Sequence, residues 1–126
     1  MKKKIAGLVL LSAVPMLAGL SRLFSLSLGA PTLDDHARFS ADPVTAVLHI
    51  IGATAFATVG AFQFVPSLRR SAWHRVAGRV LSVLGLVGAA AGAVMTLAWQ
   101  PKPFDSAWLT AVRMVVTAAM VAFIVA

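Results

Sequence analysis

The chain has 126 residues, of which 60% are hydrophobic and 12% are charged, and its mean hydropathy is +0.89. A soluble domain of this length needs more polar surface to cover its core, so the composition excludes a soluble protein and predicts an integral membrane protein. The net charge of +7 does not indicate a nucleic-acid partner, because the basic residues fall in short connections and are not combined with stacking aromatic residues.

The first apolar segment covers about residues 5–30 and follows the basic start MKKK. A spanning helix needs ~20 apolar residues, so the segment is long enough to cross a membrane. Pro15 in its middle predicts a kink, which helix bundles tolerate. A cleaved signal peptide is the alternative. The length of the segment, with Leu28 and Pro31 placed around a cut after Ala30, favours a retained helix.

Three further apolar segments cover about residues 44–65, 76–99 and 107–126. The polar loop 31–43 precedes the first of them, the basic connection PSLRRSAWHR precedes the second, and the turn QPKPFDS precedes the third. The two prolines of that turn forbid a helix there. The sequence therefore predicts an all-α fold, in which residues 1–126 form one membrane domain of four transmembrane helices.

The charges of the connections separate by sign. One side of the predicted domain holds basic residues, namely Lys2, Lys3, Lys4, Arg69, Arg70, Arg75 and Arg79. The other side holds the acids Asp34, Asp35, Asp42 and Asp105. The positive-inside rule then predicts a cytoplasmic N-terminus and a cytoplasmic stretch WHRVAGR. The last segment ends in MVAFIVA without a polar anchor, from which we expect either a further segment or a partner that covers this end.

Three ionisable residues, Arg22, His49 and Arg113, fall inside the predicted helices at a common depth, roughly 9–12 Å beneath the outer surface. Ionisable groups at membrane depth are costly, and they commonly mark functional sites. Because Arg binds carboxylate and phosphate and His ligates iron or exchanges a proton, we predict a binding layer for haem b, a quinone or a lipid phosphate. The alternative is that both Arg side chains snorkel to the headgroups while His49 bonds a backbone carbonyl. Pairing with Asp34, Asp35 or Asp42 at the outer rim is a further alternative.

The stretch WHRVAGR carries more positive charge than topology requires. Arg near a helix start opposes the helix dipole, so these residues do not serve as caps. We predict that the connection binds lipid headgroups or a partner subunit through Arg69, Arg70, Trp73, His74, Arg75 and Arg79. A small polar pocket formed with Gly60, Gln63 and Gly78 is a further alternative.

Small residues at helical spacing predict where helices approach closely. The glycines concerned are Gly52, Gly60, Gly85, Gly88 and Gly92. Packing within one chain is favoured over a homodimer interface.

The sequence carries no recognisable catalytic motif. It has no Cys, no phosphate-binding glycine loop and no useful Ser/His/Asp spacing. Asp34, Asp35 and His36 fit a solvated loop better than a metal site. We therefore predict no metal site and favour a protein that is not an enzyme.

The order of several short motifs carries a family resemblance. LHI surrounds His49, the same predicted helix ends in GAFQF, the connection contains LRR, and HRVAGRV follows. This order resembles the domain-of-unknown-function family twenty-three-zero-six (DUF2306), most closely from Val44 to Val80. The resemblance implies a multi-pass protein of the bacterial cytoplasmic membrane without a settled biochemical function. Family members usually carry an aromatic residue where this chain has Leu81, and they usually continue beyond the fourth helix. We therefore expect a truncated chain or a short variant that a partner completes.

Three functions remain open from the sequence. The favoured one is a small, non-enzymatic accessory or structural subunit that packs with lipid and a larger membrane complex. The second is a haem- or quinone-binding electron-transfer protein that uses His49 with Arg22 and Arg113, although a single intramembrane His argues against bis-His haem in a lone monomer. The third, a carrier of a small solute or of protons, is weakened because no acid lies within the predicted bilayer segments.

Overall fold

Four long helices make up most of the described part of the protein. The structure, a computed structural model, describes residues 2–28, 36–99 and 105–126. Helices α1 (Lys2–Leu28), α3 (Pro43–Gly60), α4 (Ala72–Ala98) and α5 (Ala107–Val125) are each long and apolar enough to span a membrane, and no strand occurs in the described residues. The prediction of an all-α membrane protein with four transmembrane helices is confirmed.

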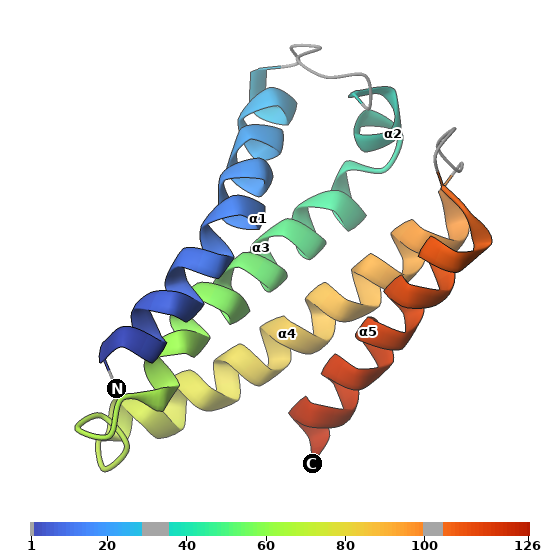
Figure 1. Ribbon diagram of the computed structural model, residues 1–126. Coiled ribbons are helices and arrows are strands. Elements are labelled where there is room, and N and C mark those ends of the chain that lie inside the picture. The colour runs from blue at the N-terminus through green and yellow to red at the C-terminus, as the bar shows by residue number, and fades with distance from the viewer. Residues whose placement is uncertain (1, 29–35, 100–104) are drawn as a thin grey trace.

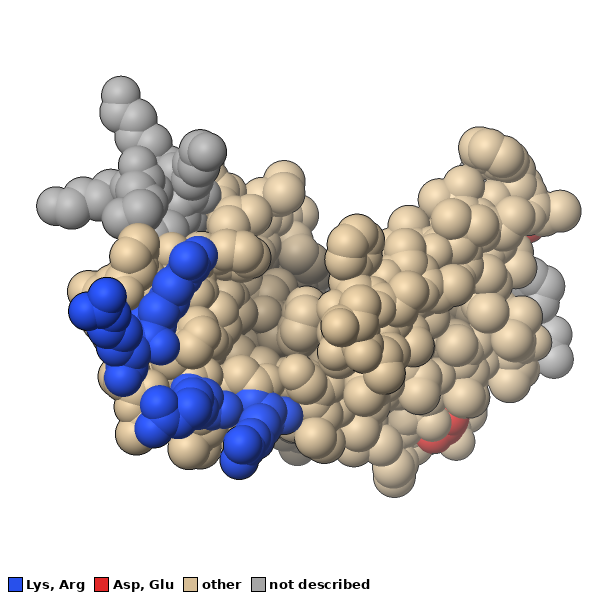
Figure 2. All heavy atoms as spheres, turned by 90° about the horizontal axis from the view of Figure 1, so that it is seen from below, with Lys and Arg blue, Asp and Glu red and all other residues tan. Residues whose placement is uncertain are grey.

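The helices lie side by side as a bent layer (Figure 1). α3 and α4 form the central pair, α1 packs on α3, and α5 packs on α4. Seen from one end, the two sides of the molecule rise around a hollow (Figure 2). Cavities lined by α1, by the central pair and by α5 lie along this hollow. We call this hollow the groove. Its sides are α1 and α5, and its base is formed by α3 and α4.

Glycines bring the two central helices into close contact. A Cβ added to Gly52 would lie 2.9 Å from the Cα of Gly88, and one added to Gly88 would lie 2.9 Å from the Ala53 nitrogen. A Cβ on Gly85 would lie 2.6 Å from the Phe56 ring. Small residues are needed here because backbone and rings fill the space that a side chain would take. A Cβ on Gly60, by contrast, would meet no described atom within 4 Å.

Polar caps set where the helices begin. Asp42 accepts a hydrogen bond from the Thr45 nitrogen at 3.1 Å, and Pro43 follows it as the first residue of α3. Ser71 and Ser106 cap α4 and α5 in the same way. Because of the Ser71 cap, α4 begins at Ala72 rather than near residue 76. Trp73, His74 and Arg75 therefore lie in its first turn.

Two short elements lie in parts of the chain where no separate element was predicted. Helix α2 (His36–Ala41) occupies part of the polar loop, and a 3₁₀ helix, η1 (Ala61–Phe64), extends α3. α2 matters for function, because it turns two of its side chains, Arg38 and Phe39, toward the neighbouring helices.

The described charges of the connections lie at opposite ends of the molecule. Arg69, Arg70, Arg75 and Arg79 are exposed at the end that holds η1 and the α3–α4 connection (Figure 2). Asp42 and Asp105 lie at the end where α3 and α5 begin. The side chains of Lys2, Lys3 and Lys4 and the residues Asp34 and Asp35 fall outside the described part. Which end faces the cytoplasm remains a prediction.

Candidate ligand-binding site

His49 is held against α4 by a hydrogen bond to the backbone. Its Nδ1 lies 2.8 Å from the carbonyl oxygen of Gly88, which can only accept. Nδ1 therefore carries the hydrogen, and Nε2 keeps its lone pair. A Cβ on Gly92 would lie 2.9 Å from Nδ1 and Cε1 of the ring. Two of the predicted packing glycines, Gly88 and Gly92, thus position this imidazole, and the backbone bond still leaves one ring nitrogen available.

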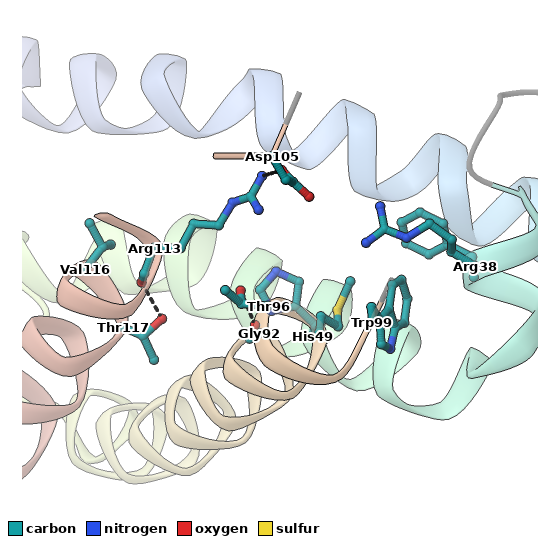
Figure 3. A pocket seen from close by; sticks show the side chains of 11 residues that line it. Arg38, His49, Gly92, Thr96, Trp99, Asp105, Arg113, Val116 and Thr117 are labelled. Atoms are coloured by element: carbon teal, nitrogen blue, oxygen red, sulfur yellow. Dashed lines mark hydrogen bonds and ion pairs between the residues drawn. The ribbon is translucent and has the colours of Figure 1, made fainter. Parts of the chain in front are cut away.

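His49 lines a cavity of about 390 Å³ that lies between α2, α3, α4 and α5 (Figure 3). Its polar lining consists of Arg38, His49, Thr96, Asp105, Arg113 and Thr117. Phe39, Met95 and Trp99 supply much of the remaining wall. A cavity that combines apolar and aromatic walls with convergent polar groups is typical of a small-molecule site.

Arg113 enters this cavity from α5 as a member of an ion pair. Its guanidinium lies 2.9 Å from Oδ1 of Asp105, and the two side chains are 41% and 10% exposed. Asp105 precedes α5, so the ion pair joins the connection before the helix to a residue within it. Because the two charges are opposite, the pair leaves little net charge at this point of the cavity. Sequence reasoning placed Asp105 on the correct side of the domain but missed it as the partner.

Two arginine side chains lie over a pair of aromatic rings beside the cavity. The Arg22 guanidinium lies 4.7 Å from the ring centroid of Phe39, and that of Arg38 lies 5.6 Å from the ring centroid of Trp99. The two rings meet edge to face, 5.2 Å apart. Cation–π and edge-to-face contacts of this kind are favourable and join α1, α2 and α4. Arg38 and Phe39 were missed because hydropathy assigns residues 31–43 to a loop.

Asp42 links this corner of the molecule, where Phe39 and Trp99 meet, to the start of α3. Its carboxylate caps α3 through Thr45 and accepts a hydrogen bond from Nε1 of Trp99 at 3.4 Å. The hydrogen bonds from Thr45, together with the weaker one from Trp99, hold the pKa of Asp42 below its ordinary value. The carboxylate form is therefore the one that orders this corner.

Arg22 lines a second cavity, of about 530 Å³, which opens into the groove. His49, Phe39 and Met95 line both cavities, so the imidazole stands between them. The wall of the second cavity is mostly apolar and includes Ile50, Ala53 and Phe56 of α3 and Met120 of α5. The structure thus brings His49 and Arg113 onto one cavity and His49 and Arg22 onto the other.

The remaining residues singled out from the sequence lie at the opposite end. Trp73 is exposed there beside the four arginines Arg69, Arg70, Arg75 and Arg79, and His74 is half-buried. Nδ1 of His74 is buried and has no hydrogen-bond partner among the described residues. None of these six residues lines the cavities that contain His49. In the part of the chain that the structure describes, no group of three His, Cys, Asp or Glu could hold a metal ion.

The fold and the site define a multi-pass helical membrane protein with a polar, aromatic cavity beside an apolar groove. Residues 46–126 match the family model described as "Predicted membrane protein (DUF2306)". The chain therefore belongs to the DUF2306 family, as the sequence motifs indicated. No curated protein and no solved structure gave a significant match.

Proposed function

We propose that this protein binds a lipid-soluble quinone, with the headgroup beside His49. The observation that carries the proposal is the hydrogen bond from Nδ1 to the Gly88 carbonyl, which leaves Nε2 as an acceptor in the neutral ring of this cavity-lining residue. A quinol hydroxyl can donate to this nitrogen, and a protonated imidazole can donate to a quinone carbonyl. The same ring can thus hold either redox state.

The charge balance of the cavity favours a quinone over a dianionic cofactor. Asp105 already neutralises Arg113, so a neutral headgroup fits this side better than carboxylates do. The hydroxyls of Thr96 and Thr117 donate to backbone carbonyls and keep their lone pairs as acceptors. The Phe39 and Trp99 rings offer surfaces beside a flat headgroup, and the apolar second cavity suits its alkyl tail.

Fluorescence of Trp99 tests this proposal, because that indole lines the cavity. The chain has three Trp, so Trp73→Phe and Trp108→Phe leave Trp99 as the single emitter. A ubiquinone analogue with a short alkyl tail, titrated into the detergent-solubilised protein, should quench this emission saturably. His49→Gln should raise the dissociation constant about three- to tenfold, the range expected for one hydrogen bond. His74→Gln is the matched control and should leave the titration unchanged.

Two results would contradict quinone binding at His49. One is quenching that is equally strong in the His49→Gln and His74→Gln variants. The other is a haem spectrum: a Soret band with α-bands that sharpen on dithionite reduction and vanish in His49→Gln. The second result would assign Nε2 to iron and the arginines to haem propionates.

A second candidate is the accessory subunit of a larger membrane complex. It is supported by α5, none of whose described residues is buried, and by the exposed arginines of the α3–α4 connection. Chemical cross-linking in native membranes, followed by purification, should then yield a defined larger species that Arg69→Gln with Arg70→Gln weakens. Recovery of the monomer alone would reject this candidate.

We further propose that the protein resides in the bacterial cytoplasmic membrane with the arginine-rich end in the cytoplasm. The separation of basic and acidic connections supports this orientation. Since the chain has no Cys, Ser67→Cys and Ser106→Cys give two clean probes. An impermeant maleimide should label only Ser106→Cys in intact cells, and labelling of Ser67→Cys alone would reverse the assignment.

A further inference from the structure

A second polar position lies at the opposite end of the groove from His49. Gln63 of η1 lines a cavity there, and its amide nitrogen, Nε2, is buried without a hydrogen-bond partner among the described residues. A buried amide donor without an acceptor is costly, because it has lost its hydrogen bonds to water and makes none within the protein. This orphaned donor therefore points to a ligand that carries an acceptor oxygen.

The cavity beside Gln63 is mostly apolar. It measures about 500 Å³ and lies between α1, α3, α4 and α5. Leu8 of α1 and Phe123 of α5 line its two sides. Ser82 adds a hydroxyl that donates to the Gly78 carbonyl at 2.9 Å and so keeps its lone pairs for another partner. The volume and lining suit a hydrocarbon chain with a polar group at the Gln63 end.

Positive charge surrounds the same end of the groove. Arg75, Gly78 and Ser82 follow one another at spacings of three and four residues, so they lie along one stripe of α4 that leads from the exposed arginines into the cavity. Arg69, Arg70 and Arg79 are also exposed at this end, and the described acids Asp42 and Asp105 lie at the other (Figures 1 and 2). A ligand with a negative headgroup matches this distribution.

We propose that this end of the groove binds an anionic glycerophospholipid. The acyl chain occupies the space between Leu8 and Phe123, an ester or phosphate oxygen accepts the hydrogen bond from Gln63 Nε2, and the phosphate lies toward Arg75. This second site shares Ser12, Phe56 and Ala57 with the cavity that Arg22 and His49 line, but its polar group is Gln63. It takes a structural or regulatory lipid rather than a redox ligand.

Native mass spectrometry of the detergent-solubilised full chain tests the proposal. The protein is titrated with phosphatidylglycerol and, separately, with phosphatidylcholine of the same acyl chains. One phosphatidylglycerol should bind with clear preference. Gln63→Leu removes the donor and should weaken its binding about tenfold.

Two glycine variants separate the cavity from the general membrane surface. Gly60 lines the cavity and a Cβ there meets no described atom within 4 Å, so Gly60→Leu fills the site without a clash at its own Cβ. Gly7 also has open space but lines no part of this cavity, which makes Gly7→Leu the matched control. Lipid binding should fall at least tenfold in Gly60→Leu and stay unchanged in Gly7→Leu.

Three results would overturn the assignment. Equal binding of both phospholipids would show that charge does not select the occupant. Unchanged phosphatidylglycerol binding in Gln63→Leu and Gly60→Leu would place the lipid on the exposed arginines instead. Competitive displacement by the ubiquinone analogue would mean that the quinone tail fills the groove. Because His49→Gln should leave phosphatidylglycerol binding unchanged, this test stands apart from the quinone proposal.

Discussion

The groove between α1 and α5 runs between two polar ends that are built differently. At the His49 end, Arg113 pairs with Asp105, Arg22 lies over Phe39, and Arg38 lies over Trp99. At the Gln63 end, buried atoms of Gln63 and His74 have no hydrogen-bond partner in the described part of the chain. The four exposed arginines there have no ion pair with a described acid.

This difference indicates two kinds of binding. Groups that are already paired or hydrogen-bonded, such as Arg113 and His49, stay in place when a ligand arrives, so little ordering of them is required. Groups without partners gain their first hydrogen bonds from the ligand, so the Gln63 end depends on an occupant for its own stability. The substitutions below either disturb the packing of α3 on α4, which both ends share, or act on one end alone.

The largest effect is expected from Gly88→Leu, which acts on both ends. A Cβ at Gly88 would already lie 2.9 Å from the Ala53 nitrogen, and backbone cannot move aside as a side chain can. The variant should force α3 and α4 apart and lower the free energy of unfolding by about 1–3 kcal/mol or more. Unfolding in mixed detergent–SDS micelles measures this change. Gly7→Leu, with open space at its Cβ, should remain near wild type, and equal stability of the two variants would contradict the close helix contact.

A smaller and more selective effect is expected from Gly92→Ala. The new methyl group would lie 2.9 Å from Nδ1 of His49, so the ring must turn away from the Gly88 carbonyl. Quinone quenching of Trp99 should weaken about tenfold, whereas phosphatidylglycerol binding at the Gln63 end should not change.

Gly78→Ala is the matched control for this variant. A Cβ there would lie 3.8 Å from Oε1 of Gln63, an ordinary contact at the other end. Its quinone titration should equal that of the wild type. Loss of both ligands in Gly92→Ala would show that the two ends are not independent.

Much of the fold could be predicted because it follows from hydropathy. Four apolar runs of spanning length determine four helices, and the family motifs from His49 to Val80 indicated the same class of protein. The start of α4 was placed too late because the apolar run begins near Val76, whereas the helix begins after the hydrogen-bonding cap at Ser71. A cap depends on a single polar residue, and an average of hydropathy over many residues hides its contribution.

The candidate site could be predicted only in part. Counting residues from the helix ends placed His49 and Arg113 at one depth, and the structure finds both on one cavity. The contributions of Phe39 and Asp105 were missed, because they come from connections whose path depends on tertiary contacts. Spacing also indicated that Gly92 packs against a helix, but not that its neighbour is the imidazole of His49.

The smallest effect is expected from protonation of Asp42, which orders the corner next to the His49 cavity. Hydrogen bonds from Thr45 hold its pKa below the ordinary 3.8, so the unfolded chain takes up the proton first as pH falls. The stabilisation is therefore complete above about pH 4 and is lost as the pH falls through the lower pKa of the folded state. Asp42→Asn keeps a capping side chain but cannot titrate. Thermal midpoints in detergent between pH 7 and pH 3 should show an extra acid loss in the wild type that Asp42→Asn lacks. Parallel curves would mean that this carboxylate does not hold α2, α3 and Trp99 together.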